Sequence, residues 1–260
     1  NKEVSLMRDI QKYTSDYDCM DDPANRFETE YQVVYRRKKV LEELKRYQHD
    51  TILEVGCGLD SYVNYITEFK AVVVEPSPKF AEKAKNELDK DGRVTVICST
   101  LEKAVKMLEH QTFDFIIVSG LLNEIEEPVD FLKSIKRLCK NCHTVIHVNV
   151  ANADSVHRLW AVEMGLIKNP CEASERNKKF QQTTVFQMES LKQTILESAE
   201  EGAIEILDMG SYFLKPFSHK QMMQCIEQGI LTETLIDGLD KMVKYFPEYG
   251  SEIYINYRMK

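Results

Sequence analysis

A pair of glycines and two acidic residues, placed at the ends of two apolar runs, have the spacing of a nucleotide-binding turn. The first run, residues 51–55, contains Glu54 and leads into Gly56-Cys57-Gly58. Glycine has no Cβ, so it permits a sharp strand-to-helix turn and the close approach of a ligand to bare backbone. The second run, residues 71–74, ends at Glu75, near the roughly 20-residue spacing at which an acidic side chain meets a ribose. The pattern predicts a cofactor that contains a nucleoside.

The residues after the turn bear on which cofactor binds, because a lone G-x-G is weak evidence. A Rossmann dehydrogenase has a third glycine or alanine where this chain has Ser61. The G-x-x-x-x-G-K-[ST] pattern of nucleotide triphosphate binding does not occur in the sequence. An NAD-dependent oxidoreductase would share the ribose-binding acid, so it remains an alternative that titration with NAD would reveal.

The sequence EVGCG over residues 54–58, together with Glu75, resembles the class I S-adenosylmethionine-dependent methyltransferases. The resemblance implies that Gly56, Cys57 and Gly58 pass under the methionine part of the cofactor. Glu54 would help to hold its amino end, and Glu75 would accept hydrogen bonds from the ribose hydroxyls. A carboxylate suits this task because charged acceptors make stronger hydrogen bonds. The resemblance also assigns Pro76 and the segment Ser99-Thr100-Leu101 to the cofactor site. This segment would border the adenine.

The segment after the fourth predicted strand, residues 119–128, looks like the family segment that usually reads LLHEVEDP. The resemblance assigns Ser119 and Gly120 to the cofactor. Asn123 stands where many members have histidine, so a base role for that histidine is not carried over. Many relatives also have an acidic residue near Thr100. Because of these two departures, a non-catalytic protein that binds the cofactor remains an alternative.

Two segments in the carboxyl half resemble one subgroup of the family. Residues 150–158 are similar to VPNANSLHR, and residues 210–222 are similar to GGYFLKPLSNAQM. That subgroup methylates small molecules, many of them linked to sugars and cell-surface polysaccharides. The resemblance implies O-methylation, at a hydroxyl or phosphoryl oxygen, of a small sugar- or nucleotide-linked acceptor, with S-adenosylhomocysteine as product. N-methylation of a small molecule remains an alternative.

The polar residues of these segments are the candidates for catalysis and acceptor binding. A hydroxyl acceptor usually needs a base, because an alcohol is a poor nucleophile at neutral pH. His157 is the first candidate, at the start of a helix after the fifth strand, and Asn152 is the second catalytic candidate. Lys215 and Arg158 could hold an anionic group of the acceptor. Asn149 could orient the acceptor and Tyr212 could wall the pocket, whereas His147, inside a strand, is expected to be a core residue.

Short apolar runs that alternate with amphipathic segments predict the elements that position these residues. Strands are expected at 51–55, 71–75, 94–98, 113–119, 144–150, 204–214 and 252–258. Helices are expected at 31–47, 61–69, 79–90, 101–109, 129–139, 154–166 with Asp154 as N-cap, 188–199 and within 221–245, with a loop at 169–182. Such alternation predicts an α/β fold with a doubly wound, mostly parallel seven-stranded Rossmann-like sheet, and a helical insertion before the last strand.

This pattern divides the chain into three parts. Residues 1–50 would form a helical N-terminal extension or lid, residues 51–150 the S-adenosylmethionine-binding core, and residues 151–260 a substrate-side segment that completes the sheet. Ligands of such sheets lie at the carboxyl ends of the strands, where the strand order switches. Each motif described above lies at such an end.

The composition limits which binding partners and which cellular compartment we expect for this protein. The 260 residues carry a formal net charge of −8, without the basic footprint of a nucleic-acid-binding protein. The one dense basic cluster, Arg36-Arg37-Lys38-Lys39, is typical of a solvated helix face. No apolar run is long enough for a membrane span and no signal peptide is visible, so we expect no membrane partner.

Seven cysteines are an odd number with no disulfide framework, which indicates a reducing cytoplasm. The sequence CKNCH over residues 139–143 matches the pattern of c-type haem attachment. Haem attachment needs export, so a turn between a helix and a buried strand is the favoured interpretation, and no metal site is expected. A homodimer is left open.

Overall fold

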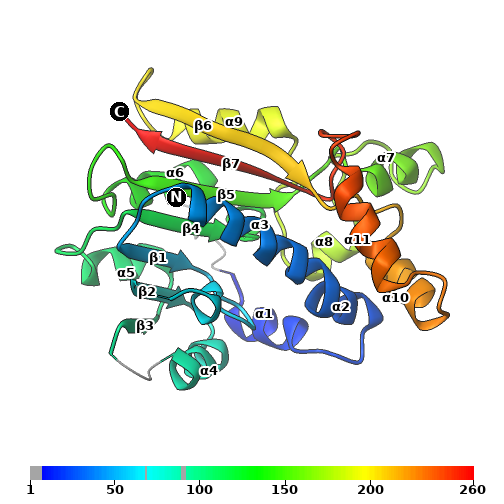
Figure 1. Cartoon of the computed structure of the whole chain (residues 1–260), viewed down its shortest axis with the longest axis horizontal. Coiled ribbons are helices and arrows are strands. Elements are labelled where there is room, and N and C mark those ends of the chain that lie inside the picture. Colours follow the sequence, from blue (N-terminus) through cyan, green and yellow to red (C-terminus); the bar gives the residue numbers. More distant parts are fainter. Residues whose placement is uncertain (1–7, 68, 89–91) are drawn as a thin grey trace, which may run out of the picture.

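Seven strands form one mixed sheet in the structure, a computed structural model that describes residues 8–67, 69–88 and 92–260 (Figure 1). The strand order is β3-β2-β1-β4-β5-β7-β6. β7 runs antiparallel to β5 and β6, and the other neighbours are parallel. The strands are β1 (Thr51–Val55), β2 (Lys70–Glu75), β3 (Val94–Cys98), β4 (Phe115–Ser119), β5 (Val145–Ala151), β6 (Ile204–Tyr212) and β7 (Glu252–Met259). The predicted doubly wound, mostly parallel sheet is confirmed.

Helices cover both faces of this sheet, as its apolar strands require. Leucine, isoleucine and phenylalanine side chains of α5, α6 and α9 form the core on one face, and α3, η2 and α4 cover the other. The helices that follow the strands are η2 (Tyr62–Tyr65), α4 (Pro78–Leu88), α5 (Leu101–Met107), η3 (Leu122–Glu124), α6 (Pro128–Lys136), α7 (Val156–Glu163), α8 (Glu175–Lys179), α9 (Met188–Glu197), α10 (His219–Glu227) and α11 (Glu233–Met242).

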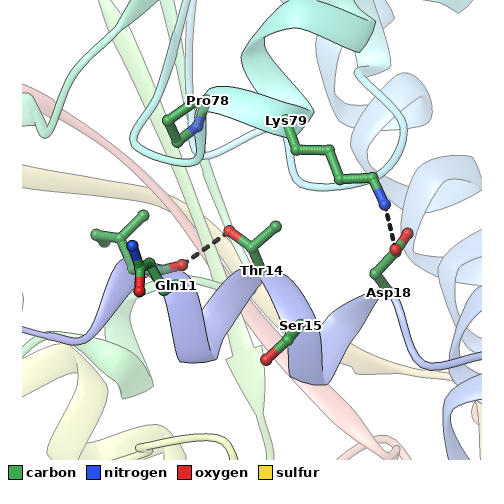
Figure 2. Close-up of a pocket in the computed structure, with 7 residues that line it drawn as sticks. Gln11, Thr14, Ser15, Asp18, Pro78 and Lys79 are labelled. Carbon is green, nitrogen blue, oxygen red and sulfur yellow. Dashed lines mark hydrogen bonds and ion pairs between the residues drawn. The ribbon is translucent and has the colours of Figure 1, made fainter.

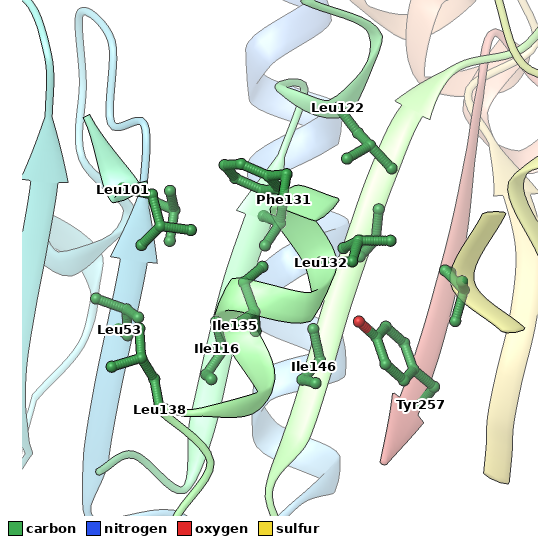
Figure 3. Packing of buried hydrophobic residues seen from close by; sticks show 14 of the residues in the cluster. Leu53, Leu101, Ile116, Leu122, Phe131, Leu132, Ile135, Leu138, Ile146 and Tyr257 are labelled. Atoms are coloured by element: carbon green, nitrogen blue, oxygen red, sulfur yellow. The ribbon is translucent and has the colours of Figure 1, made fainter. Parts of the chain in front are cut away.

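The larger core cluster shows how this packing fixes the sheet. Figure 3 shows Phe131, Leu132 and Ile135 of α6 lying against Ile116 of β4 and Ile146 of β5. Burying a side chain of this size contributes about 1.5–3 kcal/mol. The central strands are therefore held rigidly, and the loops at their carboxyl ends have a firm base.

The amino-terminal helices gather at the carboxyl ends of the parallel strands (Figure 1). They are α1 (Ile10–Tyr17), α2 (Pro23–Phe27) and the π-helix η1 (Glu28–Gln32), whereas α3 (Val33–Arg46), which follows them, runs over one face of the sheet. Phe27 and Tyr35 pack with Phe213 and Met222 in a third apolar cluster that joins this segment to α10 and α11. The predicted helical extension is present over the described part, and residues 1–7 of it lie outside the described residues. No helix of the described residues has the length and hydrophobicity needed to cross a membrane.

Three local predictions differ from the structure. The helix expected at 61–69 is only the single turn η2, because Phe69 is buried directly before β2 begins. The N-cap of α7 is Ser155 rather than Asp154, whose carboxylate accepts hydrogen bonds from the Gln187 amide. The loop expected at 169–182 contains α8, which starts with a capping box between Ser174 and Asn177.

The remaining boundaries agree to within a few residues, and the last two positions of the helix expected at 79–90 lie outside the described residues. The CKNCH segment forms the turn between α6 and β5, as the favoured interpretation expects. All seven cysteines are unpaired. Within the described ranges, no group of three or more His, Cys, Asp or Glu residues could hold a metal ion.

Candidate active site

A cavity of about 600 Å³ lies at the carboxyl ends of β1, β4 and β5, where the strand order switches. The predicted site residues that line it are Gly56, Cys57, Gly58, Ser119, Gly120, Asn152, His157, Arg158 and Lys215. The amino-terminal helices and the loops around α8 and α10 close its sides. The predicted residues that do not line it are Glu54, Glu75, Pro76, Ser99, Thr100, Leu101, Asn149 and Tyr212. The structure thus brings the two glycine loops and His157 together.

The turn after β1 has the backbone that its glycines predict. Gly56 and Gly58 have φ values of +77° and +56°, in the left-handed region that favours glycine. The Glu75 carboxylate holds this turn from the end of β2: one oxygen accepts the Gly58 N–H at 3.0 Å, and the other accepts the Ser77 N–H at 2.8 Å. Each oxygen keeps a second lone pair, so Glu75 can still accept a ligand hydroxyl.

Glu54 of β1, the strand directly before the turn, stabilises the same turn. It is fully buried, and its carboxylate accepts hydrogen bonds from the Ser61 hydroxyl at 2.5 Å and the Tyr62 N–H at 3.1 Å. Burial raises the pKa of Glu54 to about 7. In this structure Glu54 therefore caps η2 rather than facing the cavity, and its predicted contact with a cofactor stays a prediction.

The first helix covers the Glu75 side of the turn. The Thr14 hydroxyl donates to the Ser77 hydroxyl at 2.7 Å, and the Tyr13 hydroxyl oxygen would lie 3.9 Å from a Cβ on Gly58. Figure 2 shows the neighbouring contact, in which Asp18, the C-cap residue of α1, pairs with Lys79 of α4. Because α1 lies here, Glu75 is buried beneath it and outside the cavity lining.

A buried hydrogen-bond chain holds the loop after β4. Asn149 accepts from the Ser119 hydroxyl and the Gly120 N–H, both at 3.0 Å, and donates to His147 Nε2 at 2.9 Å. His147 Nδ1 donates to Asn256 at 2.7 Å, and burial lowers the pKa of His147 to about 4. The structure confirms His147 as a satisfied core residue. Asn149 thus fastens this loop from β5, and its predicted contact with an acceptor stays a prediction.

Three other candidates also have structural partners. The Asn152 amide donates to the carbonyls of residues 248 and 250, and its oxygen accepts the Asp154 N–H. The Arg158 guanidinium donates to the carbonyls of residues 170 and 172 and, at 3.4 Å, to Asn177. The Tyr212 hydroxyl donates to Glu252. Their predicted roles stay predictions, and their hydrogen bonds show that each residue also fastens a loop.

His157 differs from these residues because it has no hydrogen-bond partner among the residues that the structure describes. Its Nδ1 atom is buried and unpaired, and the residue lines the cavity. Burial, with contributions from Lys215, His219 and Arg158, holds the pKa of His157 well below 6.5. The imidazole is therefore neutral at physiological pH, which is the form that accepts a proton.

Sequence reasoning missed the residues that the amino-terminal helices contribute. The π-helix η1 turns Glu28 and Gln32 toward the cavity, and π-helical turns are frequent at functional sites. Arg36 of α3 pairs with Glu28 at 2.7 Å and with Glu252. Gln32 donates to Ser251 and Glu252, which leaves its buried carbonyl oxygen unpaired.

The basic cluster that contains Arg36 is not a solvated helix face. Arg37 pairs with Asp60, Lys38 with Asp240 at 2.5 Å, and Lys39 with Glu43 at 2.8 Å. These partners are far away in the sequence, except for Glu43. The basic cluster itself was visible in the sequence, but no local pattern identified its partners.

Comparison with known proteins bears on which cofactor the two loops hold. Residues 53–145 match the family described as a methyltransferase domain. Residues 53–145 of this chain therefore form a methyltransferase domain. The match spans β1 to the start of β5, which includes the glycine turn, Glu75 and the Ser119-Gly120 loop. A search of curated proteins found no significant match.

Solved methyltransferases share the whole fold of this methyltransferase at low sequence identity. The plantazolicin methyltransferase BamL, solved with a triazolic desmethylPZN analogue and S-adenosylhomocysteine, is 13% identical, with 96% of each chain covered and a TM-score of 0.60. The N-methyltransferase NodS of Bradyrhizobium japonicum, with S-adenosylhomocysteine, is 11% identical over 97% of this chain and 99% of that chain, with a TM-score of 0.56. A possible histamine N-methyltransferase of Thermotoga maritima is 16% identical over 96% and 99%, with a TM-score of 0.62.

The glycine turn of this methyltransferase gives a prediction with a matched control. Gly58→Ala and Gly92→Ala both place alanine at positive φ, and both positions have room for the new Cβ: the Tyr13 hydroxyl lies 3.9 Å away at Gly58, and nothing lies within 4 Å at Gly92. Both variants should lose about 1–2 kcal/mol of stability, because a left-handed residue strains any L side chain. Only Gly58→Ala adds a methyl group to the turn that is predicted to hold the cofactor. We expect calorimetry to show weaker S-adenosylmethionine binding for Gly58→Ala alone, whereas equal affinities would contradict the placement.

Proposed function

We propose that this methyltransferase transfers a methyl group from S-adenosylmethionine to a hydroxyl of a small molecule, with His157 as the base. S-adenosylmethionine, when bound, supplies an electrophilic methyl group on its sulfonium. The observation that carries the proposal is the neutral imidazole of His157, a cavity-lining residue whose buried Nδ1 is unpaired. The residues fit the cofactor, since Gly58 leaves open space and Glu75 keeps acceptor capacity.

The cavity divides into a donor half and an acceptor half. The turn at Gly56–Gly58 and the loop at Ser119-Gly120 would hold the methionine part, with Glu75 on the ribose. His157 stands opposite, on α7 beyond the end of β5, and would take the hydroxyl proton while the methyl group moves in line from sulfur to oxygen. The walls of the cavity exclude bulk water from this path. We further propose that residues 1–50 act as the lid, because α1 already lies over Glu75.

The proposed function also includes a chemical class for the methyl acceptor. We propose a small sugar- or nucleotide-linked metabolite of surface polysaccharide or secondary metabolism. The support is the similarity of residues 150–158 and 210–222 to one small-molecule subgroup, and both segments contribute cavity residues, His157 and Lys215. A cytoplasmic location is supported by the seven free cysteines.

N-methylation is the second candidate. NodS and the Thermotoga maritima protein, which share this fold, are described as an N-methyltransferase and a possible N-methyltransferase. The unpaired Gln32 oxygen could accept a hydrogen bond from an amine as well as from a hydroxyl. An amine that binds in its protonated form would also need His157 to remove a proton.

Calorimetry and an acceptor panel test the proposal together. The enzyme should bind S-adenosylmethionine at micromolar to millimolar concentration and should not bind NAD. Incubation with sugar phosphates, nucleotide sugars and small amines should yield S-adenosylhomocysteine and one methylated product, whose mass fragments locate the new methyl group. Methylated nitrogen would select the second candidate. Cofactor binding without any product from either class would favour a non-catalytic protein.

The protonation state of His157 predicts a pH profile. A base whose pKa is held below 6.5 stays deprotonated as the pH falls from 8 to 6.5, so this histidine should not reduce turnover over that range. Initial rates with saturating acceptor, at constant ionic strength, measure the profile. If turnover falls tenfold for each pH unit below 7.5, the base has a pKa near 7.5 or above and is not His157 in the environment described.

A further inference from the structure

The carboxylates that line the cavity already have cationic or hydroxyl partners. Glu28 pairs with Arg36 and with His219, and Glu252 pairs with Arg36. Asp60 pairs with Arg37, and Glu124 with Arg8. The negative charge of the cavity is therefore compensated by side chains of the protein itself.

Three cations of the cavity differ, because no carboxylate of the described residues lies within 4 Å of them. They are Lys215, Arg158 and Arg176. The N–H groups of Arg158 go to two carbonyls and one amide oxygen, which satisfy its hydrogen bonds but leave its charge unpaired. Arg176 donates one bond to the Asn25 amide oxygen at 3.2 Å and lies over the Phe180 ring.

Lys215 is the most unusual of the three. Its side chain is 2% exposed, and among the described residues its ammonium has two contacts, the His219 ring at 3.3 Å and the face of Phe27 at 5.9 Å. His219 donates its other ring N–H to Glu28 at 2.8 Å, so it offers Lys215 one neutral acceptor. Burial, with a contribution from the neighbouring Arg176 charge, lowers the pKa of Lys215 to about 7.

Leaving a buried cation without a partner is costly, and ionisable groups perturbed by burial in a cleft are candidates for functional sites. Lys215 lies four residues before α10 begins and Arg176 is in α8, yet both side chains line one cavity and influence each other electrostatically. Arg158 of α7, one residue after the proposed base His157, adds a third positive charge to this part of the cavity. The positive charge is thus concentrated in the acceptor half.

We propose that Lys215 and Arg176 form a subsite for an anionic group of the acceptor, a phosphate or a carboxylate. This inference rests on the proposed function, since it assigns the acceptor that His157 would deprotonate. Bound at the subsite, the anion accepts hydrogen bonds from the Lys215 ammonium and from the free N–H groups of Arg176. The rest of the acceptor then extends toward His157. The shared chemistry is an oxyanion, and the test below separates phosphate from carboxylate.

Binding of simple anions to the whole enzyme tests the subsite. We would titrate inorganic phosphate and, separately, acetate into the S-adenosylhomocysteine-saturated enzyme by calorimetry, with chloride keeping the ionic strength constant. The variants are Lys215→Met and Arg176→Gln. The control is Lys220→Met, which removes the same charge from an exposed position of α10.

Phosphate or acetate should bind wild type at one site, and Lys215→Met and Arg176→Gln should each weaken that binding by about tenfold or more, while Lys220→Met leaves it unchanged. The tighter anion identifies the acceptor as a phosphate ester or a carboxylate. Lys215→Met should also melt at a higher temperature than wild type without anion, which verifies that it folds. Absence of anion binding to wild type, or equal binding by Lys215→Met, would overturn the subsite.

Different experimental results would contradict the proposed methyl transfer and the anion subsite. Failure of the enzyme to bind S-adenosylhomocysteine would count against the donor site, and the same anion titration would then be run without it. Loss of turnover in His157→Ala with unchanged phosphate binding would support both. Methylation of an uncharged acceptor at full rate in Lys215→Met and Arg176→Gln would overturn the anion subsite and leave the proposed transfer intact.

Discussion

Replacing Glu75 with glutamine is expected to weaken S-adenosylmethionine binding by about a hundredfold or more. The Glu75 carboxylate accepts the N–H groups of Gly58 and Ser77 with separate oxygens. A glutamine amide has one oxygen, so its NH₂ group would face a second N–H donor. The glycine turn would lose one bond, and a bound ribose would lose a charged acceptor.

Calorimetry of the variant measures this effect directly. The control is Glu82→Gln, which makes the same chemical change at an exposed position of α4. Melting temperatures of both variants verify folding, because Glu75 is fully buried. An affinity of Glu75→Gln within twofold of wild type would show that Glu75 organises the loop but does not contact the cofactor.

Replacing His157 with alanine is expected to lower turnover by about 10²–10⁴-fold, the usual contribution of a general base. The imidazole makes no hydrogen bond to the described protein, so its removal should leave the surrounding loops in place. Cofactor affinity should therefore stay within about twofold of wild type, since the donor loops lie on β1 and β4. Initial rates and calorimetry on the same preparation separate the two quantities.

The matched control for this variant is His143→Ala, which removes an exposed histidine from the turn before β5. It should retain full turnover. Unchanged turnover in His157→Ala would remove this residue from the mechanism. A parallel loss of cofactor affinity would indicate that the imidazole instead supports the donor site.

The donor site could be predicted from sequence because its signals are local. A buried parallel strand needs an apolar run, and a turn that approaches a ligand needs glycine, so residues 51–58 show both features in order. The acid at the end of β2 follows at a fixed distance set by one strand-helix-strand unit. Glu75 and the glycines therefore stand where the pattern predicts them, with a hydrogen bond between them.

The acceptor half could not be predicted as well, because its contacts join residues far apart in the chain. Asn149 and Asn152 follow a strand end, as ligand-binding residues often do, but the tertiary structure uses both amides to fasten loops. Gln32 and Arg36 lie in a helical segment without a motif, and only the π-helix and the approach of β7 place them at the cavity. A buried, unpaired ring nitrogen distinguishes His157 from Asn149 and Asn152, and neither burial nor pairing is visible in sequence.

The central claim is that the donor binds over the glycine turn with its reactive sulfur facing His157. A crystal structure of the enzyme with S-adenosylhomocysteine tests it most directly. We expect the ribose hydroxyls within hydrogen-bond distance of Glu75, the methionine part along Gly56–Gly58, and the sulfur open toward the space between His157 and Lys215. A sulfur that faces away from His157, or a ribose bound without Glu75, would contradict the account.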